Sequence, residues 1–368
     1  MRKLNVVLSA LIAVTLFVTA TSVQAAEWGL KAGTPELKSA GSLTFGPEGI
    51  LFVGDAKSAT IFAIDTGDAS GDPASVKLNI PRLGSAVAKA LGGDEKTAQI
   101  NDLAVNPSSG NAYLSVPTAG GAALLRIDSK GKLSQLSLKG VKFSKVVLPN
   151  PPEDKETGQG RRRRNRRIES ITDLAYIDGK VLVSGLSDAT APSTVREIAF
   201  PFADADEGIN IEIYHGAHGR YENYPAVRTF VPFTIDGKPN LLAGFTCTPL
   251  VKFPLAGLSS GKPLRGTTVA ELGNRNRPLD MIVYQKGGKD FLLMANSARG
   301  VMKISTEGIS RKEGITERVG GGGVAGQTYE TIESLQGVVQ LDKLNEKHAL
   351  IVVQTEDSPA RLQTVALP

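Results

Sequence analysis

Three aspartates recur at matching places in this chain. Asp102, Asp173 and Asp280 each stand immediately before a short apolar run that is typical of a β-strand. If those strands converge, three like charges meet and repel one another unless a cation or a polar ligand compensates them. Oxygen ligands of this kind suit Ca²⁺ or another divalent cation. The alternative is that each aspartate caps its own turn by accepting hydrogen bonds from nearby backbone N–H groups.

Other oxygen-bearing side chains are placed to join this group. Asn101 directly precedes Asp102, and Asp55 and Asn296 each stand at the end of another short apolar run. The sequence therefore predicts a ligand-binding site whose members are Asp55, Asn101, Asp102, Asp173, Asp280 and Asn296. The candidate metal ligands among them are Asp102, Asp173 and Asp280.

His215 and His218 stand three residues apart and offer a different chemistry. Two histidines at this spacing can ligate zinc or copper in a helix or a suitable loop. The glycines between and after them favour a loop. The alternative to a metal site is a pair of loop histidines that bind no metal. Cys247, the one cysteine of the chain, is a candidate third ligand, but no pattern in the sequence places it near the histidines.

A basic run lies between residues 161 and 167. Guanidinium groups bind polyanions through planar, bidentate contacts, so the run predicts binding of an anionic polymer. No aromatic residue is interleaved, so stacking on single-stranded bases is not indicated. The alternative is a solvated loop paired with the acidic residues just before it. The six candidate residues are Arg161, Arg162, Arg163, Arg164, Arg166 and Arg167.

A match to the G-x-S-x-G pattern at Gly257–Gly261 is not catalytic. A nucleophile elbow needs a strand, a sharp turn and then a helix. Here Lys262 and Pro263 follow, and proline disfavours a helical conformation of the residue before it. We therefore interpret this segment as a turn between strands.

The elements that must position these residues form a repeat. Six units share one plan, which is a strand, a short turn, a strand, a longer turn and a strand. They recur at intervals of roughly 50 to 70 residues. One such unit cannot bury both faces of its sheet, whereas radial packing of the units does so. The sequence predicts an all-β, six-bladed β-propeller, with a seventh, poorly marked blade as the alternative.

The pattern resembles the six-bladed propellers grouped as NHL-like, TolB-like and gluconolactonase-like. The similarity is most evident over Phe45–Asp55, which reads FGPEGILFVGD. The gluconolactonase-like enzymes hold one divalent ion with acidic and amide side chains. Their full set of ligands is not matched here, so the resemblance implies the fold and leaves lactonase activity in doubt.

Two segments interrupt the blades. The first, residues 81–91, includes a short predicted helix over Ser85–Leu91 that is ended by Gly92 and Gly93, and we expect it to cap one face between blades 1 and 2. Residues 149–167 are rich in proline, then acidic, then basic, and predict a mobile loop.

The N-terminus predicts export. A positive start, an apolar stretch and a small-residue cleavage pattern indicate a signal peptide over residues 1–25, followed by a single domain over 26–368. The mature chain shows no transmembrane segment, and one cysteine allows no internal disulfide. The net charge of +5 is concentrated in the arginine run. We expect a periplasmic or extracellular monomer.

Two functions are compatible with these features. The first is a binding protein that engages a macromolecule, an anionic polymer or a small ligand through the propeller face or the basic loop. The second is a metal-dependent hydrolase, of the lactonase or esterase sort, working at the central channel. The sequence does not decide whether the protein is an enzyme, and it does not identify the ligand.

Overall fold

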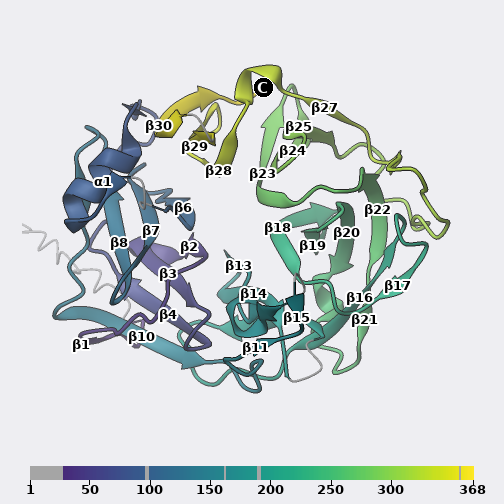
Figure 1. Ribbon diagram of the computed structural model, residues 1–368, viewed down its shortest axis with the longest axis horizontal. Helices are drawn as coiled ribbons and strands as arrows, with labels where there is room; N and C mark the ends of the chain where they lie inside the picture. Colours follow the sequence, from purple (N-terminus) through teal and green to yellow (C-terminus); the bar gives the residue numbers. More distant parts are fainter. Residues whose placement is uncertain (1–27, 96–98, 161–162, 189–191, 356–357) are drawn as a thin grey trace, which may run out of the picture.

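The computed structural model describes residues 28–95, 99–160, 163–188, 192–355 and 358–368. These residues form six antiparallel blades around a central axis, which confirms the predicted six-bladed propeller (Figure 1). We number the blades by the order in which their innermost strands occur in the chain.

Blades 1 and 2 come from the first part of the chain. From the axis outward, blade 1 contains β2 (Leu43–Phe45), β3 (Ile50–Asp55), β4 (Thr60–Asp65), β10 (Val141–Val147) and β1 (Lys31–Gly33). Blade 2 contains β6 (Asp102–Val105), β7 (Ala112–Thr118), β8 (Gly121–Ile127) and β9 (Leu133–Gln135). A 3₁₀ turn, η1 (Pro47–Gly49), connects β2 to β3.

Blades 3 and 4 follow. Blade 3 contains β13 (Asp173–Ile177), β14 (Lys180–Leu186), β15 (Ser193–Ala199), β16 (Ile209–His215) and β17 (Arg220–Glu222), and β21 (Leu264–Arg265) pairs in parallel with β16. Blade 4 contains β18 (Val227–Ile235), β19 (Lys238–Phe245), β20 (Pro249–Pro254), β22 (Thr267–Leu272) and β26 (Val324–Gly326). The rejected G-x-S-x-G segment begins at the end of η5 (Leu255–Gly257) and leads to β21, with no α-helix between them.

Blades 5 and 6 complete the ring. Blade 5 contains β23 (Pro278–Lys286), β24 (Lys289–Asn296), β25 (Gly300–Ser305) and β27 (Tyr329–Thr331). The 3₁₀ turn η6 (Glu333–Leu335) leads to blade 6, which contains β28 (Val338–Lys343), β29 (His348–Thr355), β30 (Ser358–Ala366) and β5 (Asn79–Ile80).

Tight two-residue turns set the register of three blades. Asp178 and Gly179 join β13 to β14, Asp236 and Gly237 join β18 to β19, and a glycine pair joins β23 to β24. Both residues of each pair have positive φ, between 48° and 77°. A type I′ turn requires this conformation, and its twist matches that of the flanking strands. The hairpins predicted from the Asp-Gly pairs are therefore confirmed.

The blades do not follow one another around the ring in chain order. Six large hydrophobic clusters each lie between two neighbouring blades, and they join blades 2 and 1, 1 and 3, 3 and 4, 4 and 5, 5 and 6, and 6 and 2. The chain thus builds blade 1, adds blade 2 on one side of it, and then continues on the other side with blade 3 (Figure 1).

Two strands tie distant parts of the chain together. After blade 2 the chain returns along the outside of blade 1 as β10, which pairs with β4 and with β1. The two-residue strand β5, from the connection between blades 1 and 2, pairs with β30 at the outer edge of blade 6. The pairing of β5 with β30 closes the ring by backbone hydrogen bonds between an early segment and the end of the chain.

The predicted helix is present as α1 (Leu83–Leu91), and Gly92 ends it with a φ of 68°. A left-handed residue at this position is the usual C-terminal cap of a helix. In the chain α1 lies between blades 1 and 2. In space its buried Leu83 and Val87 pack with residues of blades 2 and 6, so the helix covers the junction of those two blades.

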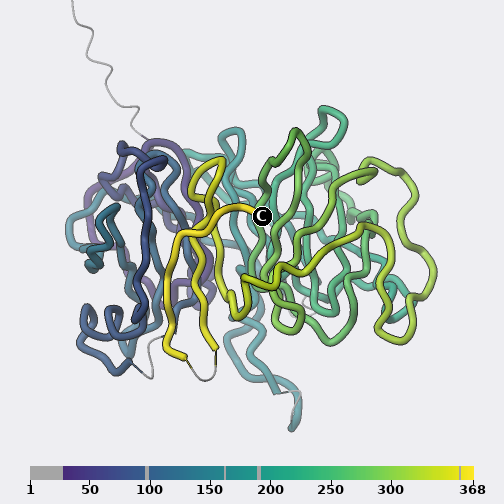
Figure 2. The backbone as a smooth tube through the Cα atoms, turned by 90° about the horizontal axis from the view of Figure 1, so that it is seen from above, coloured from purple at the N-terminus to yellow at the C-terminus, as the bar shows by residue number. Residues whose placement is uncertain are grey.

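The segment predicted as a loop over residues 149–167 contains a short hairpin. The strands β11 (Glu156–Thr157) and β12 (Arg164–Asn165) pair antiparallel, and η4 (Arg166–Glu169) follows. The hairpin projects away from the ring (teal, lower centre of Figure 2). Arg161 and Arg162 lie outside the described residues.

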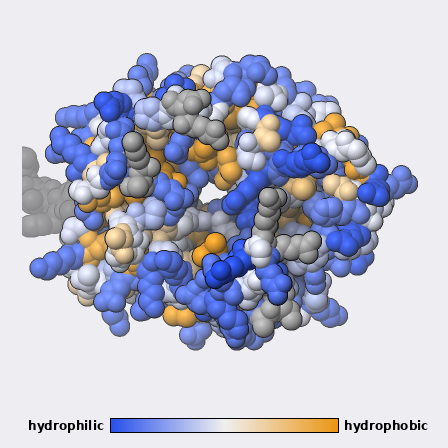
Figure 3. All heavy atoms as spheres, in the orientation of Figure 1, coloured by the Kyte–Doolittle hydropathy of each residue, from blue (hydrophilic) through white to orange (hydrophobic). Residues whose placement is uncertain are grey.

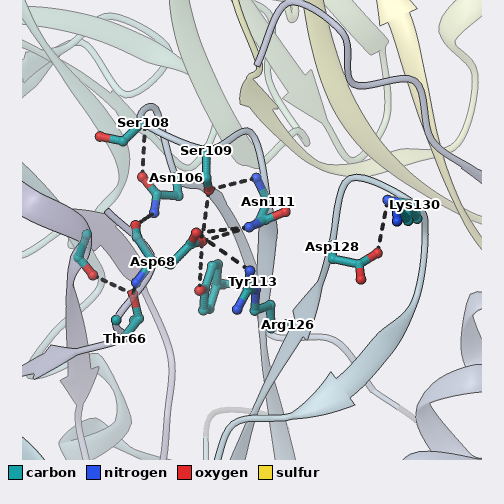
Figure 4. A network of polar contacts seen from close by, with 12 residues as sticks. Thr66, Asp68, Asn106, Ser108, Ser109, Asn111, Tyr113, Arg126, Asp128 and Lys130 are labelled. Carbon is teal, nitrogen blue, oxygen red and sulfur yellow. Dashed lines mark hydrogen bonds and ion pairs between the residues drawn. The ribbon is translucent and has the colours of Figure 1, made fainter. Parts of the chain in front are cut away.

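A buried carboxylate fixes blade 1 against blade 2. Asp68, just after β4, accepts hydrogen bonds from Ser109, Asn111 and Tyr113 at 2.8 to 3.0 Å, and Arg126 lies 3.6 Å away (Figure 4). The carboxylate is 5% exposed. Buried polar groups need such partners because they have lost their contacts with water.

The expected signal peptide over residues 1–25 lies outside the described residues. No helix in the described part of the chain has the length and apolar character needed to cross a bilayer.

Candidate ligand-binding site

The three recurring aspartates lie together along the propeller axis. Asp102 opens β6, Asp173 opens β13, and Asp280 is in β23. All three line one cavity of about 580 Å³, formed mainly by the innermost strands, which we call the channel cavity.

A fourth aspartate belongs to this group. Asp342, in β28 of blade 6, lines the same cavity. It escaped prediction from the sequence because the repeat directed attention to the residue just before each innermost strand. Asp342 instead lies near the end of β28.

Each carboxylate connects two blades. Asp173 accepts hydrogen bonds from the backbone N–H of Leu174, in its own strand, and of Phe230, in blade 4, at 2.8 and 2.7 Å. Asp280 likewise accepts from Met281 and from Leu341 of blade 6, both at 2.8 Å.

The other two carboxylates repeat the arrangement. Asp342 accepts from Lys343 and from Val105 of blade 2, at 2.7 and 2.6 Å. Asp102 accepts from Leu43 of blade 1 at 2.6 Å and also bonds the backbone of Leu103. Each of these aspartates therefore links two neighbouring blades through hydrogen bonds. Neither of the two predicted roles, a cap of its own turn or a metal ligand, includes such a link between blades.

The channel raises the pKa of all four carboxyl groups. Burial raises the pKa of Asp173 to about 7 and that of Asp342 to about 6. Burial, followed by the charge of a neighbouring aspartate, holds the pKa of Asp102 and of Asp280 well above their usual range. Hydrogen bonds from backbone N–H groups lower these pKa values and offset part of the effect of burial. All four residues keep partial exposure to the channel. A divalent cation among them stays a prediction.

The remaining predicted oxygen ligands lie elsewhere. Asp55 is buried and is fully occupied by hydrogen bonds from Lys38, Ser39 and Ser58. Asn296 is buried at the end of β24 and does not line the channel cavity. Asn101 donates to the carbonyl of Ala40 at 2.7 Å and lines a second cavity.

The second cavity has a basic rim. It encloses about 550 Å³, and the residues that precede several innermost strands contribute to its wall. Four cationic side chains and one carboxylate line it, and we call it the basic cavity: Lys38, Lys57, Arg228, Arg277 and Glu169. Figure 3 shows one face of the propeller, which is largely hydrophilic and is hollowed at its centre.

The single carboxylate of this cavity pairs with one of its two guanidinium groups. Arg228 donates from Nη2 to Glu169 Oε1 at 2.8 Å. Desolvation lowers the pKa of Arg277, the charge of Arg228 lowers it further, and Glu169 offsets part of the effect. The positive charge around the cavity is therefore only partly compensated by the protein.

The arginine run divides into side chains with different roles. Arg163 forms an ion pair with Glu156 inside the hairpin, as the alternative of a paired loop anticipated. Arg167 donates from Nε to the carbonyl of Pro152 at 2.6 Å. Arg164 is exposed and forms no ion pair within the described part of the chain. The run continues through η4 into Glu169 of the basic cavity.

The two histidines and the cysteine are neighbours in space. His215 ends β16, His218 lies in the turn after it, and Cys247 lies in the turn between β19 and β20 of blade 4. One ligand atom from each of the three lies within 4.8 Å of the other two. The sequence contained the three ligand types but no local signal for this contact between two blades.

Glu222 holds both imidazole rings. Its Oε2 atom lies 2.8 Å from Nδ1 of His215, and its Oε1 atom lies 2.9 Å from Nδ1 of His218. Burial raises the pKa of Glu222, but hydrogen bonds from Tyr224, Arg220 and both histidines outweigh that effect and lower it to about 2. Burial lowers the pKa of His215.

Comparisons with known proteins assign no family to this chain. No family model and no curated protein sequence matches the chain. Among solved structures, a candidate 6-phosphogluconolactonase from Bacteroides uniformis is 14% identical with a TM-score of 0.34, over 85% of this chain and 73% of that one. The PQQ-bound aldose sugar dehydrogenase from Streptomyces coelicolor is 13% identical with a TM-score of 0.29, over 91% and 97%. A Bacillus subtilis arabinanase is 12% identical with a TM-score of 0.35, over 73% and 94%.

Proposed function

We propose that this protein is an exported binding protein that holds an anionic polymer at the basic cavity and along the adjoining arginine hairpin. The observation that carries the proposal is the pair Arg228 and Arg277, which line one cavity where Glu169 is the one acidic residue of the lining and pairs with Arg228. An anion placed there relieves the repulsion between the two guanidinium groups and accepts planar, bidentate hydrogen bonds from them.

The surroundings of this pair support an extended ligand. Lys38 and Lys57 add two point charges to the cavity wall. Arg164 on β12 leaves its guanidinium exposed, and η4 connects that strand to the cavity wall at Ile168 and Glu169. A ligand with repeated negative charges can bind the basic cavity and the arginine hairpin together. Its affinity is then higher, because the second contact forms within a complex that already exists.

Binding is better supported than metal-dependent hydrolysis in the channel. The aspartates that would hold a catalytic ion already accept backbone N–H groups from neighbouring blades. These hydrogen bonds hold neighbouring blades together. In the basic cavity, by contrast, the positive charges of the lining are only partly balanced by acidic side chains.

Export rests on the N-terminal pattern. The positive, apolar and small-residue segments are those of a cleaved secretory signal. N-terminal sequencing of the secreted protein should begin at Ala26 or within a residue or two, and an intact Met1 in that material would contradict export by this route.

The binding proposal is tested with heparin as the probe. The double substitution Arg228→Gln with Arg277→Gln should lower heparin affinity at least tenfold and reduce its salt dependence, because fewer charges are neutralised on binding. Lys130→Gln with Lys132→Gln removes the same charge from an exposed turn of blade 2 and should change affinity less than twofold. Equal effects of the two double variants, or no effect of the first, would refute a specific site at the basic cavity.

A further inference from the structure

None of the residues His215, His218 and Cys247 lines the channel cavity or the basic cavity. His215 ends β16 of blade 3, His218 lies in the turn that follows it, and Cys247 lies in the β19–β20 turn of blade 4. The rings of the histidines lie with their centroids 3.9 Å apart. The two blades therefore place a thiol and two imidazoles around one point.

Glu222 decides which ring nitrogens are left free to bind a metal ion. An ionised carboxylate only accepts hydrogen bonds, so Nδ1 of His215 and Nδ1 of His218 are the donors to it. A neutral imidazole that donates through Nδ1 presents a lone pair at Nε2. This is the arrangement in which a carboxylate orients histidine ligands of a metal from behind.

One of these nitrogens has no partner. Nε2 of His215 is buried and accepts no hydrogen bond within the described part of the chain, and the His215 side chain is 3% exposed. A buried polar atom without a partner is costly and calls for an explanation. A metal ion bound between the rings and the sulfur supplies the missing contact.

We propose that His215, His218 and Cys247 are the three protein ligands of a site for zinc or copper, with Glu222 as the residue that positions both histidines. Nitrogen and sulfur ligands select these borderline and soft ions over Ca²⁺ and Mg²⁺, which prefer oxygen. The Cys247 thiol gives up its proton to the solvent as the metal–sulfur bond forms. The ligand atoms of a tetrahedral ion lie about 3.3 to 3.8 Å apart, so a present spacing within 4.8 Å needs a contraction of at most about 1.5 Å.

The site leaves one coordination position open. The group of candidate ligands within the described residues has three members, whereas structural zinc sites are closed by four. His218 has 45% of its side chain exposed, and Cys247 is partly exposed. Solvent or a small exchangeable ligand can therefore reach the ion, as in sites that exchange or activate a bound molecule.

The site adjoins the basic cavity without depending on it. Arg228 of that cavity donates from Nε to Oγ1 of Thr246 at 3.1 Å, and Thr246 directly precedes Cys247. The metal proposal rests on other contacts than the anion-binding proposal, so either can fail while the other holds.

Cobalt is the probe for the test, because Co²⁺ bound to a thiolate gives a characteristic charge-transfer absorption. The full-length mature protein is reduced, stripped of metal and titrated with Co²⁺, and then Zn²⁺ and Cu²⁺ are added as competitors. We expect one Co²⁺ per chain, a thiolate band, and displacement by Zn²⁺ but not by a large excess of Ca²⁺. Cys247→Ser should abolish the band and weaken binding about 100-fold or more.

Matched variants separate the site from general effects. His218→Gln changes a partly exposed side chain, so it should fold and should still weaken Co²⁺ binding strongly. Glu222→Gln should weaken binding about 10- to 100-fold, as expected for a residue that orients ligands. His348→Gln, on blade 6, should have no effect. Unchanged cobalt affinity and spectrum in folded Cys247→Ser or His218→Gln would overturn the proposal.

Discussion

Glu222 holds His215 and His218 through its two different oxygens, which brings the two imidazole rings to a centroid separation of 3.9 Å. The carboxylate is 1% exposed, and Arg220 and Tyr224 also donate to it. The charge of Glu222 is thus shielded from solvent, and within the described part of the chain these four side chains donate to it.

We predict that Glu222→Gln lowers the free energy of unfolding by about 3 kcal/mol, because a neutral amide cannot accept from all four donors and leaves buried groups unpaired. The measurement is denaturant unfolding of the metal-free protein. Glu212→Gln on β16 is the control, since its ion pair with Arg265 is exposed and should contribute less than about 1 kcal/mol. Similar losses in both variants would show that Glu222 is not the structural centre of this turn.

Asp68 supports a second stability prediction. Asp68→Ala removes the acceptor of Ser109, Asn111 and Tyr113 between blades 1 and 2 and should lower the free energy of unfolding by about 3 kcal/mol. Asp128, also drawn in Figure 4, accepts only from backbone groups of its own exposed turn. Asp128→Ala should cost about 1 kcal/mol. If thermal unfolding ranks the two variants in the reverse order, the network is not what joins these blades.

The channel aspartates predict how stability depends on pH. Their pKa values are raised in the folded protein, to about 7 for Asp173 and about 6 for Asp342. The folded state therefore binds more protons than the unfolded state between about pH 4 and pH 7, and stability falls as the pH rises through this window. We expect the melting temperature to rise when the pH is lowered from 8 to 5.

The matched variant for this prediction is Asp173→Asn, which no longer titrates. Its melting temperature should depend less on pH than that of the wild type over the same range. If the melting temperatures of both proteins depend equally on pH, titration of Asp173 in the channel does not cause the dependence.

Calcium provides a separate test of the predicted cation. A rise in pH favours the ionised form of the channel carboxylates, which then repel one another, so a Ca²⁺ ion shared by Asp102, Asp173 and Asp280 should raise the melting temperature at pH 8 more than at pH 5. Asp280→Asn should reduce the effect. If Ca²⁺ leaves the melting temperature unchanged at both pH values, these residues link neighbouring blades and do not share a cation.

The sequence predicted local features well. The pairs Asp178-Gly179 and Asp236-Gly237 specify hairpins because their backbone conformation is encoded by two adjacent residues. The position of α1 followed from Gly92 in the same way.

Features that depend on distant contacts escaped prediction. Nothing near β10 or β5 in the sequence indicates that these strands pair with blades 1 and 6, so the order of the blades was not readable. Asp342 was missed because it lies near the end of β28 and not before the start of its strand, and it reaches the channel through contacts with other blades. Cys247 lies beside the histidines only because blades 3 and 4 pack together.

The arginine hairpin yields the last prediction, because its side chains separate binding from stability. Arg164→Gln removes an exposed guanidinium and should weaken heparin binding about two- to fivefold while leaving the melting temperature unchanged. Arg167→Gln removes the hydrogen bond to the Pro152 carbonyl, which anchors the base of the hairpin, and should lower the melting temperature by a few degrees. Both variants lose one positive charge, so a purely electrostatic contribution is the same for each. If Arg164→Gln binds heparin as the wild type does, the hairpin takes no part in the anion site, and the basic cavity must account for it alone.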